Sequence, residues 1–415
     1  MILNWVWLGF ILCAIAAALV QTLGGDAAAL PRLMSALFDA ARGGFEVSLG
    51  LVGVMALWLG LMRIGQQAGM IDAFARAVNP VMRQLFPGVP AGHPAQGAMT
   101  LNISANLLGL DNAATPLGLK AMQELQSLNP RPDTATNAQV MFLVLNTAGL
   151  TLIPTSVIAI RQTLAARQGL TGFNAADIFV PTLVATACSL LAALLAVAAV
   201  QRIPLWRASL LGPLAGFAAA AGALVWWLSR QPPEQAAQWM GVVGAGAILG
   251  VIALFLVAGA VRRVNVYEAF VDGAKEGFGV AVQIIPYLVA MLAAIALFRA
   301  AGLMDVAMGA LGAAVAALGL PTDFLPAVPV GLMKILSGSG ARGLMVDVMQ
   351  AHGVDSFPAK LAAIIQGSTE TTFYVLAVYF GSVGVKHTRH ALPCALIADA
   401  VGLVAAIFVG YAFFK

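Results

Sequence analysis

Long apolar stretches alternate with short polar ones along the whole chain. Nine of the apolar stretches carry few charged side chains and reach the length of about 20 residues that an α-helix needs to cross a bilayer. The pattern therefore predicts an all-α polytopic membrane protein with nine full spans. These spans are residues 4–23, 45–65, 137–162, 176–200, 207–229, 238–261, 277–299, 361–384 and 391–413.

Two further apolar segments are interrupted at their centres by glycine and hydrogen-bonding side chains. They are residues 93–128, with the core NISANLLGLDNAATPLG, and residues 322–352, with the core LMKILSGSGARGLM. Irregular backbone at membrane depth is stable only where protein or a water-filled cavity surrounds it. We therefore expect two re-entrant helical hairpins, with tips near residues 111–116 and 337–342. A cytosolic loop with Asn-capped helices is the alternative for residues 93–128.

Two connecting segments carry mixed polar and apolar side chains. Residues 24–44 contain glycine, proline and arginine, and we expect a loop with a short amphipathic piece there. Residues 67–87 place one aspartate and two arginines among large apolar residues. This mixture is typical of a helix that lies along the membrane interface.

The span at 361–384 contains an unusual polar run. The residues QGSTETT begin at Gln366, and the run includes Glu370, which lies far from the next charged residue, Lys386. A carboxylate within the membrane is costly, and such residues mark functional sites more often than other residues do. The alternative is that the hydroxyl side chains join helices by hydrogen bonds.

Composition agrees with a membrane protein. The chain is 60% hydrophobic and 10% charged, with a mean hydropathy of +0.90, whereas soluble domains have about 25% charged residues. The net charge of +4 is small and scattered, which argues against nucleic-acid binding. The three cysteines, Cys13, Cys188 and Cys394, lie in apolar segments and predict neither a disulfide framework nor a metal site.

The two halves of the chain repeat one another. FDAARGGFEVSLG begins at Phe38 and VDGAKEGFGVAVQ at Val271, an offset of 233 (271 − 38). GMID at Gly69 and GLMD at Gly302 have the same offset (302 − 69 = 233). The sequence predicts a first repeat over residues 1–200, a linking helix and loop over residues 201–237, and a second repeat over residues 238–415.

Basic residues predict the orientation of the repeats. Cytoplasmic loops are enriched in Lys and Arg, and three short loops carry them, at Arg202 and Arg207, at Arg262, Arg263 and Lys275, and at Lys386 and Arg389. With these loops inside, the two polar spans run in opposite directions, which makes the repeats inverted, with the N-terminus inside and the C-terminus outside. This arrangement leaves Arg161 and Arg167 outside, which argues against it.

The polar segments also carry a resemblance to a known family. ANLLGLDNAATPLGLKAMQEL with NTAGLTLIPTSVIAIR resembles spore maturation protein A, and LMKILSGSGARGLM with QGSTETTFYVLAVYFGSVGVKHTRHAL resembles spore maturation protein B. The chain thus resembles a fusion of the two, which are members of the nucleoside-recognition, or gate-domain, family. That family includes parts of concentrative nucleoside transporters. The resemblance implies a multi-pass protein of the bacterial inner membrane.

Two functions from different classes remain open at this point. The first is a secondary transporter of a small polar or anionic solute, nucleoside-like or a carboxylate, coupled to Na⁺ or H⁺ and needing no other cofactor. Its substrate-binding residues would come from both hairpins and both polar spans. They are Asn106, Asp111, Asn112, Thr115, Asn146, Thr147, Thr151, Ser337, Ser339, Arg342, Gln366, Ser368, Thr369, Glu370 and Thr371.

Arg342 would favour an anionic solute, although it could instead pair with Glu370 or Asp347. The second function is a non-transporting membrane scaffold for envelope or spore maturation. An enzyme is not expected, because no nucleophile–base pair, zinc spacing or phosphate loop occurs in the sequence. The expected partners are a small solute and the lipid bilayer, no nucleic acid is expected, and a homodimer stays open.

Overall fold

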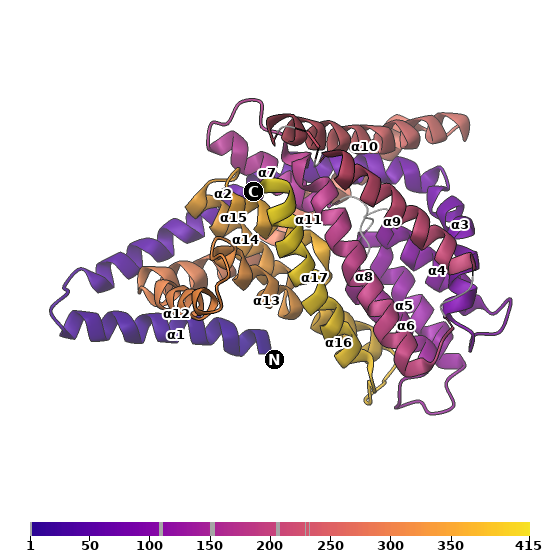
Figure 1. Ribbon diagram of the computed structural model, residues 1–415, viewed down its shortest axis with the longest axis horizontal. Coiled ribbons are helices and arrows are strands. Elements are labelled where there is room, and N and C mark those ends of the chain that lie inside the picture. Colours follow the sequence, from indigo (N-terminus) through magenta and orange to yellow (C-terminus); the bar gives the residue numbers. More distant parts are fainter. Residues whose placement is uncertain (1, 108–110, 150–153, 205–207, 229, 232) are drawn as a thin grey trace. The chain divides into compact units, whose positions relative to one another are not determined.

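The protein is helical wherever its structure is described. The computed structural model describes residues 2–107, 111–149, 154–204, 208–228, 230–231 and 233–415. These residues form helices and connecting turns without a β-strand, and an isolated parallel bridge joins Thr134 to His387 (Figure 1). An all-α fold is therefore confirmed for this part of the chain.

The first half of the chain contains eight α-helices and one 3₁₀-helix among its described residues. They are α1 (Ile2–Leu23), α2 (Ala29–Gln67), α3 (Met70–Leu85), α4 (Pro94–Leu107), α5 (Asp111–Ser127), α6 (Asn137–Ala148), α7 (Thr155–Arg167), η1 (Ala175–Ile178) and α8 (Phe179–Gln201).

The second half contains nine α-helices and one 3₁₀-helix among its described residues. They are α9 (Ala208–Leu228), α10 (Pro233–Val261), α11 (Val266–Ala300), α12 (Leu303–Ala317), η2 (Leu325–Ala327), α13 (Val328–Leu336), α14 (Gly338–His352), α15 (Phe357–Ser368), α16 (Thr372–Ser382) and α17 (Ala391–Phe414).

The order and length of these helices repeat between the halves. The long helices α2 and α11 end 233 residues apart (300 − 67), as the sequence offset predicts. A left-handed glycine follows each of them, Gly69 with φ 74° and Gly302 with φ 75°, and the next helix then begins. Further along, α6 and α15 are both 12 residues long and start 220 residues apart (357 − 137). The backbone therefore repeats the element order that the sequence predicts.

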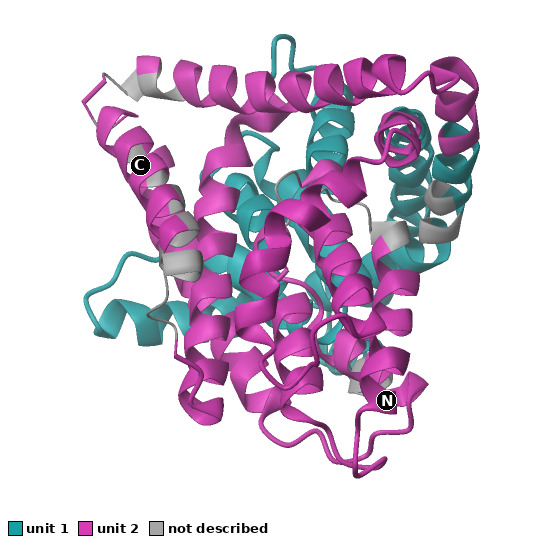
Figure 2. Ribbon diagram, turned by 90° about the vertical axis from the view of Figure 1, so that its right-hand side faces the viewer, with its two compact units in different colours: residues 1–58, 156–173, 274–366 teal, residues 59–155, 174–273, 367–415 magenta. Residues whose placement is uncertain are grey.

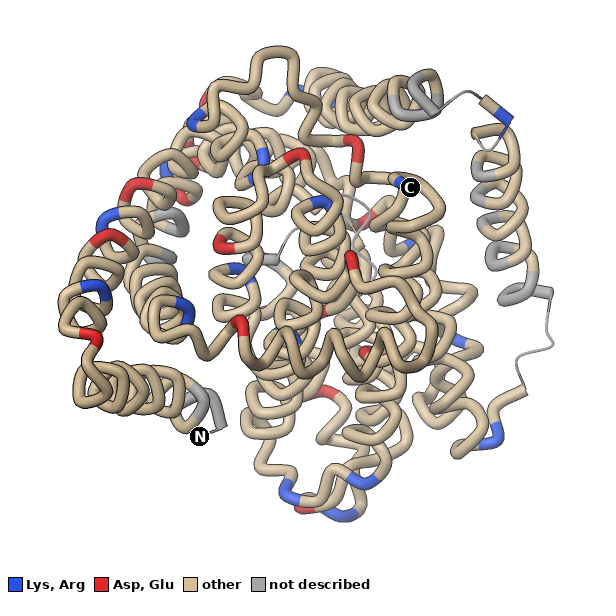
Figure 3. The backbone as a smooth tube through the Cα atoms, turned by 60° about the vertical axis from the view of Figure 1, so that its left-hand side comes forward, with Lys and Arg blue, Asp and Glu red and all other residues tan. Residues whose placement is uncertain are grey.

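Five helical segments in the described part, one of them made of α15 and α16 together, are long and apolar enough to cross a membrane, and a sixth candidate is a pair of helices bent by 74°. Long stretches of these helices carry no Lys, Arg, Asp or Glu (Figure 3). Four of the nine predicted spans are shorter, bent, interrupted, or extend beyond the described residues, so the count of nine stays a prediction. The five spans are Ala29–Gln67, Ala175–Gln201, Gln238–Val261, Phe357–Ser382 and Ala391–Phe414, and the bent pair is Ile285–Ala300 with Leu303–Ala317.

One predicted loop is wrong. Residues 24–44 were expected to form a loop with a short amphipathic piece, but α2 begins at Ala29 and continues without a break to Gln67. Its polar side chains pair along the helix, as in the bond between Arg42 and Glu46 at 2.8 Å, and they do not end it. The loop is reduced to the turn between α1 and α2.

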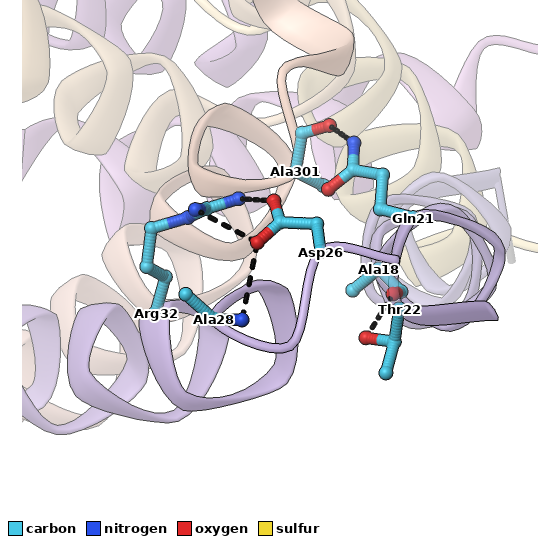
Figure 4. A network of polar contacts seen from close by, with 7 residues as sticks. All are labelled: Ala18, Gln21, Thr22, Asp26, Ala28, Arg32 and Ala301. Atoms are coloured by element: carbon cyan, nitrogen blue, oxygen red, sulfur yellow. Dashed lines mark hydrogen bonds and ion pairs between the residues drawn. The ribbon is translucent and has the colours of Figure 1, made fainter. Parts of the chain in front are cut away.

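Asp26 stabilises that turn (Figure 4). Its Oδ1 accepts a hydrogen bond from the backbone N–H of Ala28 at 3.1 Å, and its Oδ2 pairs with Arg32 at 2.6 Å. The hydrogen bond from Arg32 holds the pKa of Asp26 below its usual value, so the carboxylate stays ionised at neutral pH. Gln21 ties the end of α1 to the carbonyl of Ala301 at 3.0 Å. The polar residues of the turn therefore fix where α2 begins.

The chain forms two compact units (Figure 2). Unit 1 comprises residues 1–58, 156–173 and 274–366, and unit 2 comprises residues 59–155, 174–273 and 367–415. Each unit contains the helix pair of one predicted hairpin. Each unit also contains one of the two helices that make up each interrupted span, 137–162 and 361–384. Unit 1 contains α13, α14, α7 and most of α15, whereas unit 2 contains α4, α5, α6 and α16. The two predicted repeats, residues 1–200 and 238–415, are consecutive along the chain and differ from these units. They stay a prediction.

Small residues hold α8 and α17 together in unit 2, where the two helices lie side by side (Figure 1). The hydroxyl of Ser189 on α8 donates to the carbonyl of Ala398 on α17 at 3.0 Å. A Cβ at Gly402 would lie 2.8 Å from Cγ2 of Thr369 and 3.1 Å from Cβ of Ser189. Small residues let membrane helices approach closely, so Gly402 brings α17 against both α8 and the break before α16.

We expect Gly402→Ala to destabilise unit 2. The added methyl group overpacks a tight contact, at a cost of about 1–3 kcal/mol. Gly250→Ala on α10 is the matched control, because its Cβ would meet nothing within 4 Å. Alanine improves helix propensity at both positions, so the difference between the two thermal midpoints isolates the packing cost. Equal midpoints would contradict the close approach of α8 and α17.

Candidate functional site

Two helix breaks meet inside unit 2. The first follows α6, which ends at Ala148, and the second is the irregular segment 369–371 between α15 and α16. The backbone N–H of Glu370 donates to the carbonyl of Thr147 at 2.9 Å. Because the last carbonyls of a helix have no partner within it, this bond satisfies one of them and joins the two breaks.

Gly149 makes the close contact between the breaks. It caps α6 in a left-handed conformation with φ 43°, which suits glycine. A Cβ at this position would lie 2.6 Å from Cγ of Glu370. The hydroxyl of Thr186 on α8 donates to the carbonyl of Gly149 at 2.9 Å. Backbone and side chains from three segments therefore place the Glu370 carboxylate beside the end of α6.

The helix pair α4 and α5 also contacts the C-terminal part of α6. The side-chain amide of Asn106, near the end of α4, donates to Oδ1 of Asn146 on α6 at 2.9 Å. Asn146 in turn donates to the carbonyl of Phe142 at 2.8 Å, which fixes its orientation. Asn102 ties α4 to α5 by donating to the carbonyl of Ala114 at 2.7 Å. This packing of α4 against α5 agrees with a helical hairpin, although its place in the membrane stays a prediction.

Six of the predicted site residues therefore converge in unit 2. Glu370 and Asn106 are half-buried, and the other four are buried. Amide, hydroxyl and carboxylate groups at one place can bind a polar solute or a cation. The six residues are Asn106, Asn146, Thr147, Thr369, Glu370 and Thr371.

A second group of predicted residues lies in unit 1. Ser337 is the one residue between α13 and α14, and its hydroxyl accepts from the backbone N–H of Gly340 at 3.0 Å. It also lies 3.2 Å from the hydroxyl of Ser339. Ser337 thus caps α14, a structural role that competes with solute binding. Gln366 is buried, and its Oε1 has no hydrogen-bond partner among the described residues, whereas its Nε2 lies 3.5 Å from the carbonyl of Gly338.

The ion pair of Asp347 on α14 differs from the partner considered for it in the sequence analysis. Asp347 forms an ion pair with Arg299 of α11, with 2.5 Å between the two side chains. Asp347 was one of two partners considered for Arg342, and its carboxylate is held by Arg299 instead. Arg342 is half-buried on α14.

Five further predicted residues remain. Thr151 and the side chains of Asp111 and Asn112 lie outside the described residues. Thr115 is half-buried on α5, and Ser368 is buried at the end of α15. A role in solute binding stays a prediction for these five residues, as it does for the other ten. The expectation that the two hairpin tips lie together concerns residues of different units and also stays a prediction.

The sequence analysis missed a buried carboxylate in unit 2. Asp399, the only charged residue of α17, is 4% exposed and accepts a hydrogen bond from the hydroxyl of Thr372 at 2.7 Å. The same rule that selected Glu370 would have found it. The sequence analysis also named no polar residue in the span 176–200, but Thr182, Thr186 and Ser189 form a buried polar face at helical spacing on α8.

The described residues contain no group of three or more His, Cys, Asp or Glu side chains that could hold a metal ion. His390, at the start of α17, contacts the side chain of Gln201 at 3.0 Å. Burial, together with the nearby charge of Arg389, lowers the pKa of His390, so its ring is neutral at physiological pH. Arg389 itself donates to the carbonyl of Ala135 at 3.1 Å. His390 and Arg389 thus join the start of α17 to the end of α8 and to the loop before α6.

The helices and the polar breaks together define a multi-pass membrane protein with polar groups inside its apolar helices. Residues 48–164 and 281–386 match the family described as Gate, nucleoside recognition, and these ranges cover more than half of the 415 residues. The chain belongs to this family. The two matched ranges begin 233 residues apart (281 − 48), the offset found in the sequence and in the backbone.

Two curated relatives come from Bacillus subtilis (strain 168). The chain is 46% identical to spore maturation protein B over 159 residues, which are 38% of this chain and 88% of that protein. It is 42% identical to spore maturation protein A over 154 residues, which are 37% of this chain and 76% of that protein. The similarity to a fusion of the two is thus confirmed. No solved structure matches the chain.

Proposed function

We propose that the protein is a secondary transporter of a small polar or anionic solute in the bacterial inner membrane, coupled to Na⁺ or protons. The observation that carries the proposal is the half-buried carboxylate of Glu370 at the meeting of two helix breaks. Breaks of this kind expose backbone groups that regular helices use internally. Secondary transporters bind solutes and coupling ions at discontinuous helices within the membrane.

The groups around Glu370 suit a solute with both donors and acceptors. The amides of Asn106 and Asn146 and the hydroxyl of Thr147 supply both kinds of group. The N-terminus of α16, which follows Thr371, adds backbone N–H groups that favour a negative or polar group of the solute. The family description, nucleoside recognition, supports a nucleoside-like solute.

The repeated element order supports two inverted repeats with re-entrant hairpins, the N-terminus inside and the C-terminus outside. In this arrangement the interrupted spans, 137–162 and 361–384, cross the membrane in opposite directions. We infer that the protein is not an enzyme, because the family description, nucleoside recognition, and the names of the two spore maturation relatives suggest a non-enzymatic membrane protein.

A thermal-shift screen of the purified full chain tests the proposal. Nucleosides, carboxylates and their mixtures with Na⁺ are added at acidic and neutral pH, and a ligand that binds only the folded state raises the thermal midpoint by mass action. We expect one solute class to raise the midpoint, and Na⁺ or low pH to strengthen its effect. A scaffold for envelope or spore maturation would show no shift with any solute, which would overturn the proposal.

A further inference from the structure

Three helix ends of unit 2 meet at one side-chain amide. Nε2 of Gln201, the last residue of α8, donates to the carbonyl of Asn137, the first residue of α6, at 2.9 Å. The same nitrogen lies 3.0 Å from Nε2 of His390, the residue before α17. Gln201 and His390 are both half-buried. These three residues, Asn137, Gln201 and His390, form a contact that we call the Gln201 junction.

The geometry of the junction requires a neutral His390 ring. An amide nitrogen donates two hydrogens and accepts none, so both of its partners must be acceptors. The carbonyl of Asn137 always accepts, whereas Nε2 of His390 accepts only when the ring is neutral and its proton is on Nδ1. The opposite orientation of the amide would turn the Gln201 oxygen towards the carbonyl oxygen of Asn137, and two acceptors repel each other. Both contacts therefore exist together only while Nε2 of His390 carries no proton.

The charge beside the junction opposes a proton on His390. Arg389 donates to the carbonyl of Ala135 at 3.1 Å and to Oδ1 of Asn137 at 2.9 Å, so its guanidinium is held at the start of α6. Burial of the ring, and in addition the charge of Arg389, lower the pKa of His390 below its ordinary value, which is about 6.5 for histidine. The electrostatics thus agree with the neutral ring that the hydrogen bonds require.

Other titratable side chains lie on the elements around the start of α17, which packs against α6, α8 and α16. Asp133 is the acidic residue of the loop before α6. It is exposed, and its Oδ1 accepts from the hydroxyl of Thr134 at 3.0 Å. No titratable side chain occurs on α6. The set is Arg131 and Asp133 before α6, Cys188 on α8 and Arg202 after it, Tyr374 and Tyr379 on α16, Lys386, His387 and Arg389 before α17, and Cys394 and Asp399 on α17.

We propose that the Gln201 junction is a proton-sensitive clamp, closed while His390 is neutral and released when the ring binds a proton. Protonation makes Nε2 of His390 a donor that faces the donating amide nitrogen of Gln201. The amide must then move away from the ring, or turn over and lose the carbonyl of Asn137. Either movement removes a bond between helix ends, so acid loosens the meeting of α6, α8 and α17.

The direction of the pH effect follows from the pKa of His390. Because this pKa is lower in the folded protein than in the unfolded chain, the unfolded chain binds the proton at a higher pH. The clamp therefore contributes its full stability above about pH 6.5, and this contribution is lost as the pH falls through the folded pKa. The charge pattern predicts that the loop with Lys386 and Arg389 is cytoplasmic, so the clamp would respond to the pH of the cytoplasm.

The clamp lies at the other end of α6 from the candidate solute site. Ten residues separate Asn137 from Thr147 (147 − 137), or roughly 15 Å at 1.5 Å per residue. Release of the clamp thus frees the helix that carries Asn146 and Thr147. The effect on solute binding rests on the proposed transport function, whereas the clamp itself needs no solute and is tested without one.

Nitrogen-15 NMR of the full chain, labelled at histidine and embedded in lipid bilayers, tests the state of the ring. The chain has four histidines, and the signals lost in His390→Gln identify His390. We expect a ring with its proton on Nδ1 at neutral pH and a titration midpoint below about pH 6.5. A proton on Nε2 at neutral pH, or a midpoint above that value, would overturn the clamp.

Hydrogen–deuterium exchange tests the release. Glutamine at position 390 offers an oxygen to Gln201 and has no proton to gain, so it keeps the clamp closed at every pH. Wild type and His390→Gln should exchange equally near pH 8, and near pH 5 the wild type should exchange faster at residues 129–137 and 383–391. His387→Gln is the control and should follow the wild type, because His387 is exposed and makes its described contacts through its backbone. Equal exchange of wild type and His390→Gln near pH 5 would refute the release.

Gln201→Glu decides the question even if His390→Gln does not fold. A carboxylate accepts from the protonated ring and stabilises its charge, so this variant reverses the preference of the junction. We expect the thermal midpoint of Gln201→Glu, measured relative to wild type, to rise as the pH falls from about 8 to about 5. A difference that does not change with pH would show that His390 does not sense protons at this junction.

Discussion

Replacing Glu370 by glutamine is expected to abolish ion- or proton-coupled solute uptake while the protein stays folded. The backbone bond from Glu370 to Thr147 does not depend on the side chain. The neighbouring amide and hydroxyl groups both donate and accept, so they can pair with glutamine as well as with a carboxylate. Glutamine can neither take up a proton nor balance a cation. Function that depends on charge should therefore be lost selectively.

Uptake into proteoliposomes and the thermal midpoint of Glu370→Gln measure the two parts of this expectation. Glu276→Gln is the control, because Glu276 is an exposed glutamate on α11. We expect uptake to fall to the level of empty liposomes for Glu370→Gln and to stay at the wild-type level for Glu276→Gln. A stable Glu370→Gln protein with full coupled uptake would remove Glu370 from the mechanism.

Gly149→Ala should weaken solute binding as well as stability. A side chain at a left-handed position costs about 1–2 kcal/mol, and here the new methyl group would lie 2.6 Å from Cγ of Glu370. The Glu370 side chain must rotate away, because its own backbone N–H is fixed to Thr147. We expect solute affinity to fall on the order of tenfold, which corresponds to about 1.4 kcal/mol.

Gly169→Ala separates the two effects of Gly149→Ala. Gly169 also has a positive φ, at 71°, but a Cβ there would meet nothing within 4 Å. Both variants should therefore lose stability, while only Gly149→Ala should lose affinity in a solute titration followed by thermal shift. Equal affinities for the two variants would show that the contact between Gly149 and Glu370 does not position the carboxylate.

The repeat could be predicted because short sequence segments recur in both halves of the chain at the same offset. The glycines at 69 and 302 are required where a long helix ends in a left-handed turn, and both positions show that conformation. The meeting of Asn146 with Asn106, and of Glu370 with Thr147, was expected from polar residues in apolar segments. An apolar span offers few ways to satisfy such groups, so they gather where helices are broken.

Other features could not be predicted or were overlooked. The start of α2 depends on pairing such as that between Asp26 and Arg32, which a count of polar residues does not show. Asp399 was visible as a lone carboxylate in an apolar span, but only the fold gives its partner, Thr372. The assignment of α6 and α7 to different units depends on tertiary packing, which hydrophobic periodicity does not encode.

Solute uptake against an imposed ion gradient tests the central claim most directly. Proteoliposomes containing the purified full chain are given a solute that raises its thermal midpoint, together with an inward Na⁺ or proton gradient. A coupled transporter predicts that the solute accumulates above its external concentration and that an ionophore abolishes this accumulation. Binding without accumulation, or accumulation equal to that of protein-free liposomes, would contradict the transport function.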